Sequence, residues 1–339
     1  MASFPIHRAA EFLKTEGEPS FETTLPRELA HKRAVEEIFL TDVIIDQARE
    51  LVIAGAQLPR SHALYNEVDN GIHDLLLILE IGRQGMTIYG HIGFAVPEET
   101  AFVMSGLRAE VVDLEALRQG DGPAELVIDV PFGEERRDGR GRVRGYTLKG
   151  SGAIDGRPTI EFSGEARLIP EALYERVRSV SVGEGVEIPP PPVPADPARV
   201  GRRSPANVVV GDVDNHDGEL RCALIADPSH PAFFDHPLDH VPGMLMLETA
   251  RQAAVLHVGA RGWPPQQAVV DACEAHFTQY AALSPPALCC VRPREGLSAE
   301  GASPGGSPAP AENLRVHFSQ AGTDIGYVDM RLRLADAGG

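Results

Sequence analysis

Two apolar stretches of the chain carry the same three polar residue types at the same spacing. They are "LLLILEIGRQG" (75–85), with Glu80, Arg83 and Gln84, and "GMLMLETARQA" (243–253), with Glu248, Arg251 and Gln252. In a helix, positions i, i+3 and i+4 share one face, so each stretch places a carboxylate, a guanidinium and an amide together. A desolvated carboxylate can accept a proton, and an arginine fork can hold a phosphate.

Each triad also has a plainer interpretation, a local Glu–Arg ion pair where the helix reaches the surface. Ions on an apolar helix face are costly unless they are paired or serve a purpose. This cost favours a functional use for at least one of the two triads, although duplication of the chain would copy a purely structural pair just as well.

The triads belong to a longer internal repeat. Sliding the chain by 168 residues places 58–85 over 226–253 without a gap and aligns Ser61-His62 with Ser229-His230. Two copies at this distance predict a duplicated domain and not a solenoid. The repeated histidines, His62 and His230, are interpreted as residues that fix a bend between strand and loop.

The order of elements is similar in both copies. Short strand patterns precede an apolar helix, near 72–89 and 241–259, and β-rich runs follow it. A helix that is apolar on nearly all sides must be buried on nearly all sides, and a curved antiparallel sheet wrapped around it achieves this. The sequence therefore predicts an α+β fold, a tandem double hotdog that forms an internal pseudo-dimer.

Composition sets the expected domain boundaries. Residues 1–20 are interpreted as an N-terminal extension, 21–179 as the first hotdog domain, 180–206 as a Pro-rich linker and 207–339 as the second hotdog domain. A Gly/Ser/Pro/Ala tract at about 296–312 predicts a disordered insertion in the second domain. The arginine-rich runs 134–144 and 198–203 are interpreted as a solvated hairpin tip and as part of the linker, or alternatively as docking patches for an acidic carrier protein.

Charge and hydropathy exclude several classes of protein. The formal net charge is −18, and binders of nucleic acid or anionic membranes need a basic surface instead. No run reaches the roughly 18 apolar residues of a membrane span, and the N-terminus has no secretory pattern. The sequence predicts a cytoplasmic protein without a metal site and without a cofactor, present as a monomeric pseudo-dimer or as a dimer of it.

The stretch "FFDHPLDHVPGMLMLE" (233–248) resembles the hotdog dehydratases of fatty-acid synthesis. Those enzymes have paired aromatics, a His-Phe-Pro loop, a Pro-Gly helix start and an acid on the helix, with the histidine and the acid on opposite subunits. Here Asp235-His236-Pro237 replaces the loop. The resemblance implies the architecture and an acyl-thioester tunnel more than it implies dehydratase chemistry.

A resemblance to the A-factor biosynthesis family of streptomycetes covers nearly the whole chain. It is carried by residues 25–43, by "PRSHALY" (59–65), by the first apolar helix and by "FFDHPLDHVPGMLMLETARQAA" (233–254). The family implies acyl transfer from a β-ketoacyl acyl carrier protein thioester to the hydroxyl of dihydroxyacetone phosphate. The phosphorylated ester then cyclises to a butenolide phosphate, the precursor of a γ-butyrolactone or furan signal.

This reaction suggests roles for particular residues. The resemblance implies Glu80, Glu248 and Arg251 as site residues, and the proton acceptor is expected to be a desolvated glutamate or a histidine with a pKa near neutrality. Arg251 or Arg83 is the expected phosphate ligand. Free amides at the start of the second helix, at Gly243 and Met244, are the expected oxyanion donors. Gln84, Gln252 and His240 are supporting residues.

The two copies differ at the loop before the helix. His236 and His240 stand where the first copy has Val68 and Ile72. If the interface follows the dehydratase pattern, His236 faces Glu80, and Glu248 faces a site that lacks this histidine. The hypothesis is one full site and one partial site, with His236 as the third catalytic residue. A single loop histidine with a purely structural hydrogen bond is the alternative.

Two other functions fit parts of the sequence. One is a hotdog dehydratase or thioesterase acting on acyl carrier protein substrates, which needs no phosphate acceptor. The other is a non-catalytic acyl-ligand sensor, in which Glu248→Ala and Arg251→Ala would leave ligand binding intact.

Overall fold

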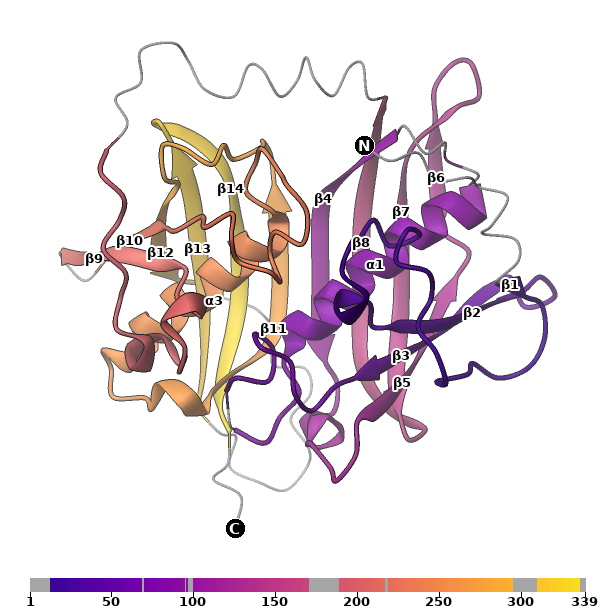
Figure 1. Ribbon diagram of the computed structural model, residues 1–339, viewed down its shortest axis with the longest axis horizontal. Coiled ribbons are helices and arrows are strands. Elements are labelled where there is room, and N and C mark those ends of the chain that lie inside the picture. The colour runs from indigo at the N-terminus through magenta and orange to yellow at the C-terminus, as the bar shows by residue number, and fades with distance from the viewer. Residues whose placement is uncertain are drawn as a thin grey trace. The chain divides into compact units, whose positions relative to one another are not determined.

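The computed structural model describes residues 13–68, 70–94, 96, 100–170, 189–216, 219–294 and 310–335. The chain divides into two compact units, and both are shown in Figure 1. Unit 1 comprises residues 1–60 and 77–179, and unit 2 comprises residues 61–76 and 180–339. The segment 61–76, which leads into the first long helix, therefore belongs with the second half of the chain.

Unit 1 is an antiparallel sheet with one long helix, α1 (Leu75–Phe94), most of which lies in this unit. Its strands are β1 (Leu13–Lys14), β2 (Leu40–Asp46), β3 (Leu51–Leu58), β4 (Thr100–Val111), β5 (Ala124–Pro131), β6 (Glu134–Arg137), β7 (Val143–Ile154) and β8 (Arg157–Pro170). Their order is β1-β2-β3-β5-β7-β8-β4, with β6 paired to β7. Only β1 pairs in parallel within this unit's described strands.

Unit 2 repeats this plan around helix α3 (Gly243–Gly259). Its strands are β9 (Val210–His216), β10 (Glu219–Leu224), β11 (Ala268–Phe277), β12 (Leu288–Pro293), β13 (Ala311–Gln320) and β14 (Thr323–Leu334). Their order is β11-β14-β13-β12-β10-β9, and every neighbour is antiparallel. Residues 244–258 of α3 are all buried, as expected of a helix that a sheet surrounds.

Short 3-10 turns connect these elements. They are η2 (Val35–Glu37), η3 (Leu114–Leu117), η4 (Pro197–Val200), η5 (Pro205–Asn207) and η6 (Pro265–Gln267). The turns η2 and η5 occupy equivalent places, directly before the first long strand of each unit. Residues 197–206, inside the predicted linker, are ordered by η4 and η5, and η4 packs on α3.

The predicted fold class is confirmed, because each unit holds one long buried helix and an antiparallel sheet. The arginine-rich run 134–144 forms the β6–β7 hairpin, with four exposed residues in β6. The predicted insertion at 296–312 falls largely outside the described residues. In the described part of the chain, no helix is both long and apolar enough to cross a membrane.

Candidate active site

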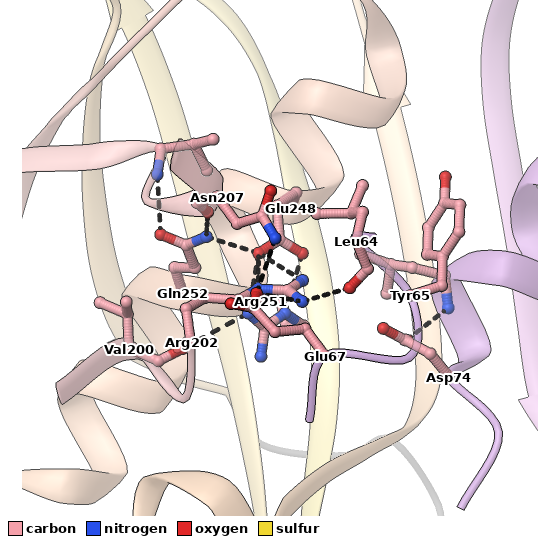
Figure 2. Close-up of polar contacts among 12 residues, drawn as sticks. Leu64, Tyr65, Glu67, Asp74, Val200, Arg202, Asn207, Glu248, Arg251 and Gln252 are labelled. Carbon is pink, nitrogen blue, oxygen red and sulfur yellow. Dashed lines mark hydrogen bonds and ion pairs between the residues drawn. The ribbon is translucent and has the colours of Figure 1, made fainter. Parts of the chain in front are cut away.

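Glu248 is the centre of a buried ion cluster in unit 2, drawn in Figure 2. Arg251, one turn further along α3, donates from Nε to Oε2 (2.8 Å) and from Nη2 to Oε1 (2.7 Å). Gln252 donates from Nε2 to Oε1 of the same carboxylate at 2.5 Å. The three polar residues of the sequence motif are thus in direct contact, as their spacing predicts.

Arg202 approaches the same carboxylate from the segment between η4 and η5. Its Nε donates to Glu248 Oε1 at 3.1 Å, and its Nη2 lies 2.8 Å from the same atom. The side chain of Arg202 is 0% exposed and that of Glu248 is 1% exposed. Two guanidinium groups therefore share one buried carboxylate, and this compensates the cost of removing the ions from water.

Glu67 ties the segment 61–76 to this cluster. Its carboxylate accepts from the amides of Arg203 (2.8 Å) and Ser204, and from Asn207 Nδ2 (2.7 Å). It also lies 3.4 Å from Arg202 Nη1, which donates to the carbonyl of Leu64 as well. Glu67 is 8% exposed, so it supplies a second buried negative charge beside the two arginines.

Gln252 makes two further hydrogen bonds, both to backbone groups. Its Nε2 also donates to the carbonyl of Asn207 (2.6 Å), while its Oε1 accepts from the amide of Val209 (2.9 Å). These bonds satisfy backbone groups where η5 runs into β9 and tie that segment to α3. In unit 1, Gln84 makes the same pair of bonds, to the Glu37 carbonyl (2.7 Å) and from the Phe39 amide (3.2 Å).

The Glu80 cluster in unit 1 is built on the same pattern. Arg83 donates from Nε and Nη2 to the two carboxylate oxygens, both at 2.7 Å, and Gln84 donates to Oε1 at 3.0 Å. Lys32 Nζ lies 3.1 Å from Oε1. Lys32 takes the place that Arg202 has in unit 2, and Arg83 is 22% exposed where Arg251 is 5% exposed. The first cluster is therefore less enclosed than the second.

Both glutamates are fully ionised at neutral pH. Burial alone would raise the pKa of Glu248, but the charges of Arg202 and Arg251 and their hydrogen bonds hold it down at about 2. Burial opposes ionisation of Glu80 in the same way, and Arg83 and Lys32 hold its pKa well below the usual range. The expectation that a desolvated glutamate has a near-neutral pKa is therefore wrong for both residues, because each is paired with two cations.

Asp74 is a further carboxylate near the unit 2 cluster. Burial raises its pKa above the usual range, against the attraction of Arg251 and Arg202. Its Oδ1 accepts from the amide of Leu76 (2.9 Å) and thereby caps the start of α1. The repeat aligns Asp74 with Pro242, which gives α3 no side-chain cap.

The start of α3 is consequently suited to binding an oxyanion. The Leu245 amide is bonded to the Pro242 carbonyl (3.0 Å), and the Gly243 and Met244 amides precede it in the first turn. A carboxylate at the start of α1 would repel a developing negative charge, whereas α3 begins without one. This difference supports the predicted oxyanion donors Gly243 and Met244, which stay a prediction.

His236 forms a pair with the residue before it. Its Nδ1 lies 2.7 Å from Asp235 Oδ1, and Asp235 is 4% exposed while His236 is 29% exposed. A carboxylate at Nδ1 holds the proton there and leaves the lone pair on Nε2, the arrangement that a histidine base requires. His240 pairs with Asp239 at 3.0 Å, but Asp239 is 47% exposed and holds the ring less firmly.

The repeated histidines behave as structural residues. His62 Nδ1 accepts from the amides of Leu64 and Tyr65, both at 3.2 Å. His230 Nδ1 likewise accepts from the Phe233 amide (3.4 Å), and its Nε2 lies 3.0 Å from Asn207 Oδ1. Both rings therefore stabilise the bend after the strand, as the sequence predicts.

His73 is buried without a hydrogen-bond partner in the described part of the chain. The residue is 0% exposed, and neither ring nitrogen is bonded. Desolvation lowers its pKa from 6.5 to about 4. In the unfolded chain His73 takes up a proton near pH 6.5, whereas in the folded chain it does so only at about pH 4. The contribution of neutral His73 to the free energy of unfolding is therefore complete above pH 6.5 and is lost as pH falls toward 4.

We expect the free energy of unfolding of the His73→Phe variant to fall less steeply than that of the parent protein between pH 6.5 and pH 4. The difference from the unsubstituted protein should reach up to about 3 kcal/mol at the acid end. Urea unfolding at a series of pH values measures it. His257→Phe is the matched comparison, because burial also lowers the pKa of His257 to about 4. Parallel pH curves for the His73 variant and the parent protein would contradict the assignment.

Comparison with known proteins identifies the family. The model of the AfsA family, described as the A-factor biosynthesis hotdog domain, matches residues 13–170 and 184–336, one copy in each half. The chain belongs to the AfsA family. Two relatives, from Streptomyces virginiae and Streptomyces griseus, are both named 2-oxo-3-(phosphooxy)propyl 3-oxoalkanoate synthase. The first is 34% identical, over 80% of this chain and 88% of the relative, and the second is 33% identical, over 76% and 82%.

Solved structures resemble this AfsA family member in fold alone. A protein from Lactobacillus plantarum described as an oleoyl thioesterase aligns with a TM-score of 0.51 at 11% identity, covering 86% of this chain and 98% of that one. An isomerase-inactive variant of GphF DH1 aligns with a TM-score of 0.50 at 11% identity, covering 89% and 98%. The double hotdog architecture predicted from the sequence is confirmed by the family match and by these folds.

Sequence reasoning missed four charged residues that complete the clusters of this AfsA family member, namely Lys32, Glu67, Asp74 and Arg202. A signal for two of them was present, because a shift of 170 residues, which aligns 39–43 with 209–213, also aligns Lys32 with Arg202. Glu67 aligns with Asp235 in the 168-residue repeat, which is a signal for a carboxylate in this loop, whereas Asp74 aligns with Pro242 and has no such signal. In the described residues, no three His, Cys, Asp or Glu side chains gather as a metal ion would require.

Proposed function

We propose that this protein transfers a 3-oxoacyl group from a thioester to the hydroxyl of dihydroxyacetone phosphate. The product is a 2-oxo-3-(phosphooxy)propyl 3-oxoalkanoate. The observation that carries the proposal is the match to synthases of this name over most of both chains, at 34% and 33% identity. The ion cluster of the motif is present in both units, which supports a complete family member rather than a degenerate copy.

The proposed chemistry is a single displacement at the thioester carbonyl. The acceptor oxygen forms a bond to the carbonyl carbon, the carbon–sulfur bond breaks, and the hydroxyl proton passes to His236 Nε2 and then to the departing thiolate. The amides of Gly243 and Met244 would stabilise the oxyanion. Asp235 would hold the imidazole in the tautomer that this transfer needs.

The glutamates take a different role in this proposal. With a pKa of about 2, Glu248 is a poor proton acceptor, and it acts as a fixed anion that orients Arg202 and Arg251. Arg83, the more exposed of the two motif arginines, is the better candidate to contact the acceptor phosphate, and Arg251 stays the alternative.

The donor and the later steps complete the proposal. The donor is a β-ketoacyl acyl carrier protein, and the ester then closes by attack of its acidic carbon, between two carbonyls, on the ketone of the triose. Loss of water gives a butenolide phosphate, the precursor of a lactone or furan signal. Because both substrates are cytoplasmic metabolites, the proposal places the enzyme in the cytoplasm.

Release of thiol from the donor tests the reaction type. A transferase should release thiol from a 3-oxoacyl thioester only when dihydroxyacetone phosphate is present, and a thioesterase should release it equally with and without the acceptor. Dihydroxyacetone without phosphate is the matched control, because it offers the same hydroxyl but no group for an arginine fork. Release that does not depend on the acceptor would favour the thioesterase alternative.

A further inference from the structure

An apolar pocket lies inside unit 1, between α1 and the sheet. Fifteen residues line it, from α1 and from strands β2, β3, β5, β7 and β8. All are glycines or apolar side chains apart from the hydroxyl of Tyr89, which accepts from the Gly133 amide at 2.9 Å. The free volume of the cavity is about 40 Å³, and the empty space that also includes open solvent is about 490 Å³. An unpaired polar ligand would be disfavoured here.

Two glycines form part of the wall that α1 contributes to this pocket. Gly82 and Gly85 are three positions apart in the sequence and so lie on one face of the helix. A Cβ atom at Gly82 would meet nothing within 4 Å, and one at Gly85 would meet only Leu40 Cδ1, at 3.9 Å. Glycine is a poorer helix former than alanine, yet neither close packing nor a positive φ requires it at these positions.

Other glycines of α1 do have a packing reason. A Cβ atom at Gly90 would lie 2.4 Å from Phe102 Cε1 and 2.8 Å from the hydroxyl of Tyr146. Gly82 and Gly85 differ from Gly90 because their missing side chains leave space instead of allowing close contact. The absence of side chains at Gly82 and Gly85 therefore keeps the pocket open.

The second copy of the domain carries side chains at the two aligned positions. The repeat that aligns Glu80 with Glu248 places Ala250 and Ala253 of α3 at the positions of Gly82 and Gly85. Both alanines are 0% exposed, so their methyl groups are packed in the interior of unit 2. The polar triads are the same in the two helices, whereas the helix face that lines the pocket carries glycines in α1 and alanines in α3.

The pocket and the ion cluster lie on opposite sides of α1. Ile81, Gly85 and Tyr89 follow each other at the four-residue spacing of one helical face and line the pocket. Glu80, Arg83 and Gln84 project from the other side, toward Lys32 and Phe39. A ligand in the pocket would therefore contact hydrocarbon and not the ion cluster.

We propose that the pocket at Gly82 and Gly85 binds the alkyl chain of the 3-oxoacyl donor and sets the chain length that the enzyme accepts. The inference rests on the proposed function for the identity of the donor. A saturated chain matches the apolar lining and needs no polar partner inside the protein. Because the counterpart positions in α3 carry alanine, unit 1 is the copy that accommodates the chain.

The test is a pair of substitutions that fill the pocket, Gly82→Ala and Gly85→Ala. Alanine fits both positions without a clash and favours the helix, so both variants should fold at least as stably as the parent protein. With a series of 3-oxoacyl thioesters of increasing length, kcat/KM should fall roughly tenfold or more for the longest accepted chains, as filling of a pocket by one carbon usually does. The shortest chains should react as before.

Gly259→Ala is the matched control, because it makes the same change at the end of α3, where the new Cβ would meet only Pro265 at an ordinary 3.7 Å. It should leave the chain-length profile unchanged. A profile that does not shift in either pocket variant, or an equal loss for all chain lengths, would overturn the inference while leaving the proposed function intact.

A binding measurement makes the inference independent of catalysis. Calorimetry with 3-oxoacyl amides, in which nitrogen replaces the thioester sulfur, should show affinity that rises with chain length in the parent protein. The pocket variants should lose that rise for the longer chains. If the parent protein bound the amides but transferred no acyl group, the proposed function would fail and the pocket assignment would stand. Affinity that is independent of chain length would overturn the pocket assignment.

Discussion

Replacing Glu248 with glutamine is expected to lower the free energy of unfolding by about 3–5 kcal/mol. The substitution keeps the volume and removes the charge, so Arg251 would lose its hydrogen-bonded counter-ion and Arg202 would keep only Glu67, 3.4 Å from its Nη1. The side chains of Arg202 and Arg251 are 0% and 5% exposed, so both charges are removed from water in the folded protein. Urea unfolding at neutral pH measures the loss.

Glu80→Gln is the matched variant, since it makes the same change in the equivalent cluster of unit 1. Its effect should be smaller, because Arg83 is 22% exposed and can turn toward solvent. Adding Arg202→Met to Glu248→Gln should recover part of the stability, since it removes one of the two buried cations that residue 248 no longer compensates. A loss below about 1 kcal/mol for Glu248→Gln would show that the cluster does not stabilise unit 2 in this way.

The ionised state of Glu248 also predicts how stability depends on pH. With a folded pKa of about 2 against 4.5 for the ordinary carboxyl, its contribution is complete above pH 4.5 and is lost as pH falls toward 2. This window lies below that of His73, which is 6.5 to about 4. The two contributions can therefore be separated in one pH series.

Replacing His236 with alanine is expected to lower kcat by about 10²- to 10⁴-fold, the usual contribution of a general base. Stability should change little, because the side chain is 29% exposed and its bond to Asp235 is local. Asp235→Asn should lower kcat as well, since an amide at this position no longer fixes the proton on Nδ1. Steady-state kinetics with the thioester and dihydroxyacetone phosphate measure both variants.

His240→Ala is the control for this experiment. It removes a second histidine of the same loop, also paired with the preceding aspartate, at 3.0 Å. We expect less than a tenfold effect, because the partner Asp239 is exposed and orients the ring weakly. Equal effects of the two substitutions, or a His236 variant that keeps the parent rate, would assign the proton transfer to another group.

Much of the architecture could be predicted from the sequence, for a physical reason. The helices 75–94 and 243–259 are apolar on nearly all sides, and such a helix must be buried on nearly all sides, as a surrounding sheet allows. The spacing of Glu248, Arg251 and Gln252 places them on one helical face, so their mutual contacts follow from helix geometry.

The rest of the site depends on contacts between segments that are distant in the chain. Arg202 stands in a Pro-rich stretch whose composition indicates a linker, yet its side chain lies beside a carboxylate 46 residues away. Glu67 precedes α1 in sequence but belongs to unit 2. The near-neutral pKa expected for the glutamates was wrong for the same reason, since the second cation on each carboxylate comes from such a distant segment.

Mass spectrometry of the product tests the central claim most directly. The purified protein would be incubated with a 3-oxoacyl thioester, free or on a carrier protein, and with carbon-13-labelled dihydroxyacetone phosphate. We predict a phosphorylated ester that contains both the acyl group and the label, accompanied by its dehydrated butenolide phosphate. Recovery of only free 3-oxo acid or unreacted thioester, with all of the label still in dihydroxyacetone phosphate, would contradict acyl transfer by this protein.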